Sequence, residues 1–563
     1  MAGSSVRNLL FVFVASLCLV SSAEARPRSG VIQKTAHPRQ TYTALGETVF
    51  DCGTYKGNES EIRGMQLLHA ANQKQSAQKT KALTTGLDYV FDNVWVIEDD
   101  GTLTVSGTNL FDTDNQTHKY TRSGTAYSIT SQAFSYDATL GTLLAPGDDG
   151  AVLVNLPFAF PYAGTTYTQM YVSGNGAVSF GAPINGAFFD PNDFLSTTPK
   201  IAPYYLDLDE TANGDVRVRS EATKYTVSWI NVFEYGQPAS NTFQLVLFPN
   251  GDFTITYNGI GSNVGSLTGF HPGGSPTLEE ISFSSGLPHT SAAGAAVFEQ
   301  YYSYTNPLVD EAALFHRFYA HFPDEFFQLI FFTNFNQTMA GFANEVNISN
   351  DVTGIGLNIF DSSGSYGSSG VLESRCNMNN LDAWASPDPA ARVFGKGNNF
   401  LTIMGQEAGH RWGAFVTYGP SHSNLILGRS DAHWSYYADL DHSSLEGGDW
   451  VSTGGNNYTC PTNIDYFSEI DEYLFGLRTP NEVKDFFFIS SASNNTVNAR
   501  SVGTPVLGSV ATGAFVPVTV EDIITSEGPR TPVVADEQHV MRQGFIFLIK
   551  QGTVPTQAQL DKV

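Results

Sequence analysis

The residues best suited to chemistry lie in one short stretch, LTIMGQEAGHRWGAF, at 401–415. Its centre, QEAGH, differs by one residue from the pattern H-E-x-x-H, which places two metal-binding imidazoles and a carboxylate on one helix. Residues four apart share a helix face, so Gln406 and His410 are expected to point towards the same place. His410 is a good zinc ligand, a neutral Gln amide is a poor one, and Glu407 suits the role of general base.

Zinc in a hydrolase takes three protein ligands and keeps one position open, so this helix needs ligands from elsewhere in the chain. The stretch GPSHSNLILGRSDAHWSYYADLDHSSLEGGDW, from residue 419, offers His422, His433, His442 and Glu446. We favour His433, which lies between Ala and Trp, and Glu446, which precedes a Gly-Gly pair suited to a turn. The sequence thus predicts a zinc site, with Glu407 as catalytic base and these candidate ligands: His410, His433, Glu446 and Gln406.

The competing interpretation is an ordinary packed helix. A single E-x-x-H occurs by chance, and Glu407 and His410 would then form a polar pair beside the apolar Trp412 and Phe415. Other catalytic patterns are weaker, because GSSG and GPSHS do not form the G-x-S-x-G turn of a nucleophilic serine. No pair of acids is fixed at the spacing of a glycosidase.

The elements that must position this helix indicate an α+β domain at 305–563. DEAALFHRFYAHFPDEF has apolar residues at helical spacing, and the following FQLIFFTNF is typical of a buried strand. In FSEIDEYLFGLRTPNEV, Ser468 and Asp471 are spaced as a capping box, which predicts a helix that ends before Pro480.

From 123 to 304 the pattern is β throughout. Short apolar or alternating runs, such as AVLVNLPFAFPYAG and NTFQLVLFPNGDFTITYNG, are separated by glycine-rich turns. Pro249-Asn250-Gly251 predicts a tight hairpin, because Asn-Gly accepts positive φ angles. Many short strands at this spacing predict an all-β sandwich.

The N-terminal 25 residues predict a secretion signal, with the apolar run Leu9–Val20 and cleavage after Ala25. No role is assigned to the segment 26–122. It contains a helix candidate, MQLLHAANQKQSAQKTKAL, and two strand candidates whose expected hairpin turn is Asp99-Asp100-Gly101.

The composition indicates a folded acidic protein of two or three domains. The 563 residues carry 55 acids against 29 bases and a net charge of −26, which disfavours nucleic acid as a partner. Charged residues make up 15% and hydrophobic ones 41%, a balance typical of globular protein rather than of a disordered acidic tail. After the leader, no segment is apolar enough to predict a membrane span.

Cleavage of the leader leaves three cysteines, Cys52, Cys376 and Cys460. Three thiols are too few for a disulfide scaffold, so we expect at most one pair and one thiol left over. Cys376 and Cys460 are the preferred pair, although the sequence leaves the pairing open.

Two resemblances add to these patterns. LPFAFPYAGTTYTQMYVSGNGAVSFG, KIAPYYLDLD and VSWINVFEYGQPASNTFQLVLFPNGDFTITYNGIG, in this order, resemble the nidogen-like (NIDO) β domain. The resemblance implies a β fold found in extracellular and adhesive proteins, with no enzymatic role.

The C-terminal region resembles a group of uncharacterised secreted bacterial proteins that carry QE-x-GHRW, AHWS and D-x-YL-x-GL, with Gln at the position of the first His of zincin peptidases. The segment from His410 to Gly413 is similar to the H-x-x-G of metzincins but departs from them at Val416, where their third His would fall. The resemblance implies a zincin-like α+β domain.

Two functions follow as hypotheses for this multidomain chain. The first is a secreted zincin-like metallopeptidase or metallohydrolase that acts on an extracellular protein or peptide, with zinc as cofactor and Glu407 as general base. The second is a non-catalytic extracellular adhesion or binding protein with a degenerate metal site and a matrix or surface ligand. Metal content separates the two.

Overall fold

The computed structural model describes the chain from residue 42 to residue 563 with short gaps. The residues left undescribed are 1–41, 45–46, 50–51, 53, 55, 57, 79–87, 185–190, 340, 385–387, 392–398, 462–465, 493–503, 506 and 538–539. The predicted secretion signal at 1–25 therefore lies outside the described residues. Among the helices that are described, none combines the length and the apolar character needed to cross a membrane.

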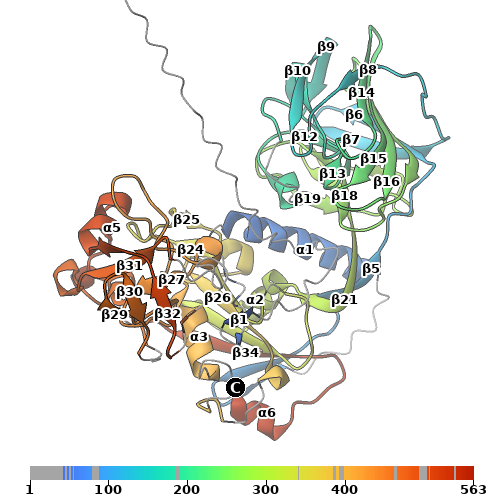
Figure 1. Cartoon of the computed structure of the whole chain (residues 1–563). Helices are drawn as coiled ribbons and strands as arrows, with labels where there is room; N and C mark the ends of the chain where they lie inside the picture. The colour runs from blue at the N-terminus through green and yellow to red at the C-terminus, as the bar shows by residue number, and fades with distance from the viewer. Residues whose placement is uncertain are drawn as a thin grey trace, which may run out of the picture.

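The described chain forms two bodies (Figure 1). One is an all-β sandwich, drawn in green and cyan at the upper right. The other is a larger mixed body that contains the start and the end of the described chain.

Two sheets build the sandwich. One has the strand order β19-β21-β18-β12-β11-β10-β9, and the other has the order β20-β7-β6-β17-β16-β15-β14-β8, with β13 paired to β15. Every pair in them is antiparallel except β19 with β21. The strands are β6 Thr117–Ser123, β7 Ala126–Gln132, β8 Thr142–Leu144, β9 Ala151–Tyr162, β10 Thr165–Ser173, β11 Val178–Ser179, β12 Lys200–Tyr205, β13 Leu208–Asp209, β14 Asp215–Glu221, β15 Lys224–Glu234, β16 Ser240–Leu247, β17 Phe253–Ile260, β18 Ser266–His271, β19 Leu278–Glu280, β20 His289–Thr290 and β21 Ala296–Val309.

The core of the sandwich is aromatic. Trp229 and Phe243 are fully buried, and their rings stack with centroids 4.9 Å apart. The hairpin predicted at Pro249-Asn250-Gly251 is confirmed, since it joins the antiparallel pair β16 and β17. Gly251 has a φ of 88°, and a Cβ there would lie 2.6 Å from the Pro161 carbonyl oxygen, so the turn requires glycine.

The mixed body is organised around a six-stranded sheet of order β23-β26-β22-β34-β4-β3. The four inner strands are parallel to one another, whereas β23 and β3 pair antiparallel at the two edges. The sheet strands are β3 Asp88–Phe91, β4 Val94–Glu98, β22 Gln328–Thr333, β23 Asn344–Asn347, β26 Ser374–Asn380 and β34 Gln543–Ile549.

Helices cover both faces of this sheet. Successive side chains of β22 point to opposite sides, so each set packs against a different helix. Leu329 and Phe331 pack in one apolar cluster with Phe315 of α2 (Glu311–Tyr319). Ile330 and Phe332 pack in another cluster with Phe400 of α3 (Phe400–Gly409). The buried strand and the amphipathic helix predicted before the site are therefore confirmed, and α3 lies on the opposite face from α2.

The segment 26–122, to which the sequence assigned no role, contributes to both bodies. β3 and β4 complete the mixed sheet, and β4 pairs directly with β34. The turn predicted at Asp99–Gly101 does not join two paired strands. The hairpin turn falls at Asp92-Asn93 instead, and β5 (Thr104–Asn109) pairs with β21. The chain thus enters the sandwich after β5 and returns through β21.

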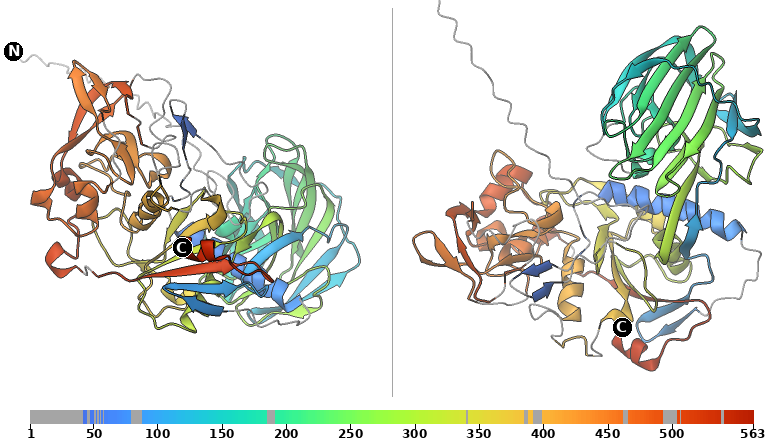
Figure 2. Two further views of the ribbon diagram at one scale, coloured as in Figure 1. Left: turned by 90° about the horizontal axis from the view of Figure 1, so that it is seen from below. Right: turned by 45° about the vertical axis from the view of Figure 1, so that its right-hand side comes forward.

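Helix α1 (Asn58–Gln78) lies between the two bodies (Figure 2). Lys74 forms an ion pair of 2.6 Å with Glu299 of the sandwich. His69, one turn earlier, contacts Asp310 at 2.8 Å, and Asp310 also caps the N-terminus of α2. Helix α1 therefore contacts both the sandwich and the mixed body.

The remaining elements lie mostly towards the C-terminus and in small sheets. The strands are β1 Tyr42–Ala44, β2 Glu47–Val49, β24 Ser349–Asn350, β25 Phe360–Asp361, β27 Trp434–Asp439, β28 Glu446–Gly448, β29 Val451–Gly454, β30 Asn457–Thr459, β31 Phe486–Ser490, β32 Val510–Thr512 and β33 Ala514–Val518. The helices are α4 Glu469–Leu474, α5 Val520–Glu527 and α6 Gln557–Lys562, and the 3-10 turns are η1 Pro191–Leu195, η2 Ser363–Tyr366, η3 Leu381–Ala383, η5 Arg429–Asp431, η6 Pro480–Glu482 and η7 Val534–Asp536.

The structure tests two sequence predictions in this region. The capping box of Ser468 and Asp471 is confirmed at the start of α4. The preferred disulfide between Cys376 and Cys460 is wrong, because both are free, buried thiols. Each lies in a different apolar cluster, Cys376 in the central sheet and Cys460 among aromatic residues of the small sheets.

Candidate metal centre

Helix α3 presents Glu407 and His410 to the interior. Asn399 caps the helix, and its side chain and that of Thr402 form reciprocal bonds that fix where the first turn begins. Glu407 lies on the buried face of the helix. His410 is the first residue after the helix, and both side chains are fully buried. The predicted helix at 401–415 is therefore shorter than expected, and Trp412 and Phe415 lie in the loop that follows.

His433 comes to the same place from the loop before β27. Its ring and that of His410 lie 4.6 Å apart between centroids. The neighbouring Trp434 donates its indole N–H to Asp471 of α4 at 2.7 Å, which anchors the first residue of β27. His433 is held between this anchored strand and the turn η5, and it is fully buried.

Both imidazoles are oriented by a backbone carbonyl. Nδ1 of His410 lies 2.8 Å from the oxygen of Gly413, and Nδ1 of His433 lies 3.0 Å from the oxygen of Arg429. A carbonyl only accepts, so each Nδ1 must donate its proton, and each Nε2 keeps a free lone pair. Nε2 of His433 is buried without a hydrogen-bond partner in the described part of the chain. This is the arrangement that metal-binding histidines adopt.

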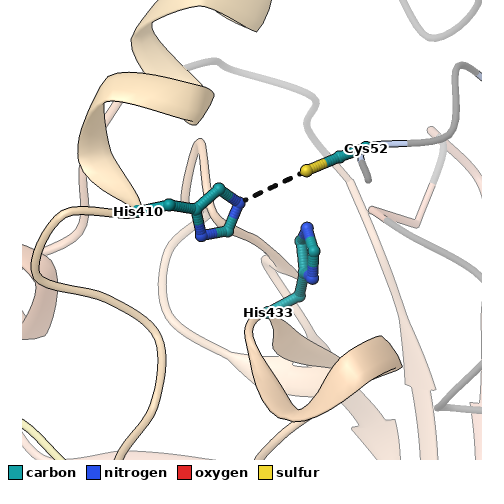
Figure 3. A group of neighbouring side chains, drawn as sticks. All are labelled: Cys52, His410 and His433. Atoms are coloured by element: carbon teal, nitrogen blue, oxygen red, sulfur yellow. Dashed lines mark hydrogen bonds between the residues drawn. The ribbon is translucent and has the colours of Figure 1, made fainter. Parts of the chain in front are cut away.

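A third group enters from far away in the sequence. Cys52 lies before α1, yet its Sγ is 3.6 Å from Nε2 of His410 (Figure 3). The possible ligand atoms of Cys52, His410 and His433 all lie within 4.8 Å of one another. The carbonyl of Cys52 accepts a bond of 2.9 Å from Arg429, the residue whose own carbonyl orients His433.

The separation of these atoms fits a shared ion. Zn–S and Zn–N bonds of about 2.3 and 2.05 Å at a tetrahedral angle place the two ligand atoms about 3.6 Å apart. The Sγ–Nε2 distance in the structure is 3.6 Å. Thiolate sulfur and imidazole nitrogen are both ligand types that zinc takes. The residues present therefore fit the metal that the sequence predicts.

Glu407 lies against the same group but is held by the N-terminal segment. Its Oε2 accepts from the Cys52 thiol at 3.2 Å and from the Thr54 hydroxyl at 3.0 Å. The Thr54 oxygen in turn accepts from the backbone N–H of Glu345, in the edge strand β23, at 2.7 Å. The second oxygen of Glu407, Oε1, has no hydrogen-bond partner among the described residues.

Burial sets the charge of these groups. It raises the pKa of Glu407 to about 7, against the opposing effect of the bonds from Cys52 and Thr54. It lowers the pKa of His410 and of His433 well below the ordinary value, which favours the neutral form of each ring that a metal ion requires. It also raises the pKa of Cys52, which disfavours a thiolate–imidazolium pair of the kind that a cysteine nucleophile needs.

The other predicted ligands are placed differently. Glu446 is buried, but its Oε1 is 4.0 Å from Nε2 of His433 and forms an ion pair with Arg429, while Oε2 has no partner in the described chain. Gln406 is half-buried on α3, one turn before His410. His422 is exposed and contacts Ser526. Of the predicted ligands, the structure brings His410 and His433 together most closely.

Sequence reasoning missed Cys52. Two signals for it were present: a motif short of one ligand, and an odd number of cysteines, which leaves one thiol unpaired. Neither says where in the chain the missing ligand lies, because Cys52 and Glu407 are 355 positions apart.

The all-β body is similar to a known family of domains. Residues 126–305 match the family described as NIDO related, which supports the prediction of a nidogen-like β domain in the middle of the chain. Over 159 aligned residues, the chain is 28% identical to alpha-tectorin from Mus musculus. That alignment covers 22% of this chain and 7% of alpha-tectorin. No solved structure matches the chain.

Proposed function

We propose that this chain is an extracellular metal-dependent hydrolase of zincin-like α+β type, with zinc as its metal and a protein or peptide as its substrate. The observation that carries the proposal is the convergence of His410 and His433. Both rings are buried, both are oriented through Nδ1, and Glu407 lies beside them. A packed helix with a polar pair gives no reason for a second buried imidazole whose Nε2 lacks a hydrogen-bond partner.

Each residue has a defined role in this proposal. His410 and His433 would hold the ion through Nε2, and the carbonyls of Gly413 and Arg429 keep the rings in the tautomer that would bind it. A bound zinc ion supplies Lewis acidity and lowers the pKa of water. Glu407, whose pKa is raised to about 7, accepts a proton from the attacking water and delivers it to the leaving group.

The NIDO-related body favours a location outside the cell. The match to a domain family related to nidogen, and the similarity to alpha-tectorin, support binding of an extracellular protein by the sandwich. They also support a second candidate function, an extracellular binding protein in which the metal site is structural or lost. Nucleic acid is not a proposed partner, because the chain carries a net charge of −26.

Zinc binding tests the proposal. The secreted wild-type chain, dialysed against zinc, should hold one equivalent by elemental analysis. His410→Ala and His433→Ala should each weaken binding by about 100-fold or more, since loss of even an outer partner costs about 10–100-fold. His422→Ala is the matched control, because this histidine is exposed, and it should leave binding unchanged.

Glu407→Gln separates catalysis from binding. It should retain the metal, because Glu407 is not a ligand in this proposal, and should lower hydrolysis of denatured casein by about 10²–10⁴-fold. A wild-type chain that binds no zinc, and that behaves like both histidine variants, would leave the binding protein as the better account.

A further inference from the structure

A buried arginine lies beside the candidate centre, and the proposed chemistry gives its side chain no role. Arg429 is 8% exposed and forms an ion pair with Glu446, which is 4% exposed. Its Nε donates to Oε1 of Glu446 at 2.7 Å, and its Nη1 donates to the carbonyl oxygen of Cys52 at 2.9 Å. Burial of a charged group is costly even when the group is paired, so packing alone does not account for an arginine at this position.

The main chain of the same residue contacts a candidate ligand. The carbonyl oxygen of Arg429 accepts from Nδ1 of His433 at 3.0 Å, which leaves Nε2 of His433 free for a metal ion. Both the side chain and the carbonyl of Arg429 are thus engaged at the centre. Because both belong to one residue in a short turn, the bonds that hold the guanidinium also limit how far the carbonyl can rotate.

Backbone strain surrounds this ion pair. Ser430 and Asp431 follow Arg429 in the turn η5 and have φ angles of 60° and 49°. Glu446, at the other end of the ion pair, has a φ of 75°. Residues other than glycine rarely adopt this left-handed conformation, and they keep it only where the surrounding structure holds them. Such positions are concentrated at functional sites, and here the ion pair joins the two strained places.

We propose that Arg429 is a positioning residue of the metal centre, whose guanidinium holds the strained turn in the shape that presents its carbonyl to His433. The inference rests on the proposed function. Glu446 is the counter-ion of Arg429 in this arrangement and not a ligand of zinc. Lysine cannot replace the arginine, because it has the charge but lacks the rigid fork of donors that reaches Glu446 and the Cys52 carbonyl together.

Arg429→Lys in the full-length secreted chain tests the inference through metal affinity. The variant should bind zinc about 10–100-fold more weakly than the wild type in competition with a chelating dye, the usual effect of losing an outer partner of a metal ligand. Arg530→Lys is the matched control. Arg530 is also buried, donates to the Leu474 carbonyl and forms an ion pair with Glu537. It orients no candidate ligand among the described residues, so this variant should bind zinc like the wild type.

Nuclear magnetic resonance of the zinc-free chain gives a readout that a purely structural role would not move. With isotope-labelled histidine, the ring of His433 in the wild type should carry its proton on Nδ1. In Arg429→Lys it should show a mixture of both tautomers, because the carbonyl is no longer held towards the ring. His410 is the internal control, since the Gly413 carbonyl orients it, and its tautomer should be the same in both proteins.

Glu446→Gln is the second variant, which keeps the inference testable if Arg429→Lys does not fold. It retains the shape of the side chain and removes its charge. The zinc-free variant should show the same mixed tautomers of His433, because the guanidinium has lost its counter-ion. If His433 keeps its proton on Nδ1 while zinc binding falls, Glu446 is a ligand and the inference is overturned.

The outcomes separate this inference from the proposed function. If the wild type binds no zinc, the proposed function fails and the inference fails with it. If the wild type binds zinc and Arg429→Lys binds it equally tightly, only the inference fails. Zinc binding that weakens in Arg429→Lys with the tautomer of His433 unchanged would also overturn the inference, because the arginine would then act by another route than the orientation of the ring.

Discussion

In the sandwich, strands that follow each other in the sequence mostly pair with each other. β14, β15, β16 and β17 are neighbours in this order, and tight turns join them. In the mixed body, β34 near the end of the chain lies between β22 and β4, and β4 lies before the sandwich begins. The sandwich is one continuous stretch of chain inserted into a body assembled from distant parts.

This difference separates what each region needs in order to fold. Closing a short loop between adjacent strands costs little entropy, so the sandwich can form from its own residues. The mixed body must first join segments on both sides of the sandwich. Its candidate centre shows the same dependence, since Cys52 comes from one side and His410 from the other.

The sharpest way to break the comparison is to divide the chain. A fragment of residues 110–309 contains every strand of the sandwich from β6 to β21 and should fold alone, with cooperative melting and a β-type circular dichroism spectrum. A fragment of residues 305–563 lacks α1, β3 and β4, so it should remain unfolded or aggregate. Adding residues 42–109 as a separate peptide should restore part of its structure.

The second fragment provides the contradicting result. If residues 305–563 melt cooperatively by themselves, then β4 and Cys52 are accessories of the mixed body and not parts of its fold.

A matched pair of core substitutions gives a smaller effect. Ile97 in β4 and Ile255 in β17 are both fully buried. Ile97→Ala and Ile255→Ala should each lower the free energy of unfolding by about 2–5 kcal/mol, the usual effect of this change in a packed core. In calorimetry of the full chain, Ile97→Ala should lower the midpoint temperature of the transition of the mixed body. Ile255→Ala should lower that of the sandwich. A single transition, with its midpoint temperature lowered equally by both substitutions, would mean that the two bodies unfold as one.

The smallest effect concerns the contact between the bodies. The Glu280 side chain of β19 is 1% exposed, 4.0 Å from Lys74 of α1, and accepts a bond from Gln300. Burial raises its pKa from an ordinary 4.5 to about 8, and Lys74 opposes the shift.

The sign of the pH effect follows from this raised pKa. The folded chain keeps the proton up to about pH 8, whereas the unfolded chain releases it above about pH 4.5. The contribution of Glu280 to stability is therefore full below that range and is lost as the pH rises towards 8. The slope is at most about 1.4 kcal/mol per pH unit.

Glu280→Gln should remove this component. The difference in unfolding free energy between the variant and the wild type, measured by urea titration, should change in favour of the variant between pH 5 and pH 8. A difference that stays constant over this range would show that Glu280 is ionised in the folded chain.

Local patterns in the sequence predicted local structure well. Asn250-Gly251 predicted the hairpin between β16 and β17, and Ser468 with Asp471 predicted the start of α4, because each signal acts within a few residues. The Asp99–Gly101 turn was also locally plausible, yet the strand after it pairs with β21, from which it is separated by the whole sandwich. A turn signal cannot show that a more distant partner is preferred.

The candidate centre was predictable only in part, for the same reason. His410 and Glu407 share one helical motif, and His433 was a candidate because a nearby loop was rich in histidine. The position of Cys52 depends on its bridge to Ala343 and on the bond from Arg429 to its carbonyl, which no spacing in the sequence encodes. The exclusion of Cys376 from pairing likewise depends on its burial in the central sheet.

The central place of β34 also determines when the protein is complete during its synthesis. Residues 88–98 leave the ribosome early, but the strand that must lie beside β4 spans residues 543–549 of 563. Until those residues appear, the apolar strands β4 and β22 lack their common neighbour. A chain interrupted before residue 543 would thus have a folded sandwich, but its six-stranded sheet would lack β34. The edges of β4 and β22 would be unpaired, which exposes them to proteases and to edge-to-edge aggregation. Residues 543–549 therefore have to be translated before the six-stranded sheet can be complete.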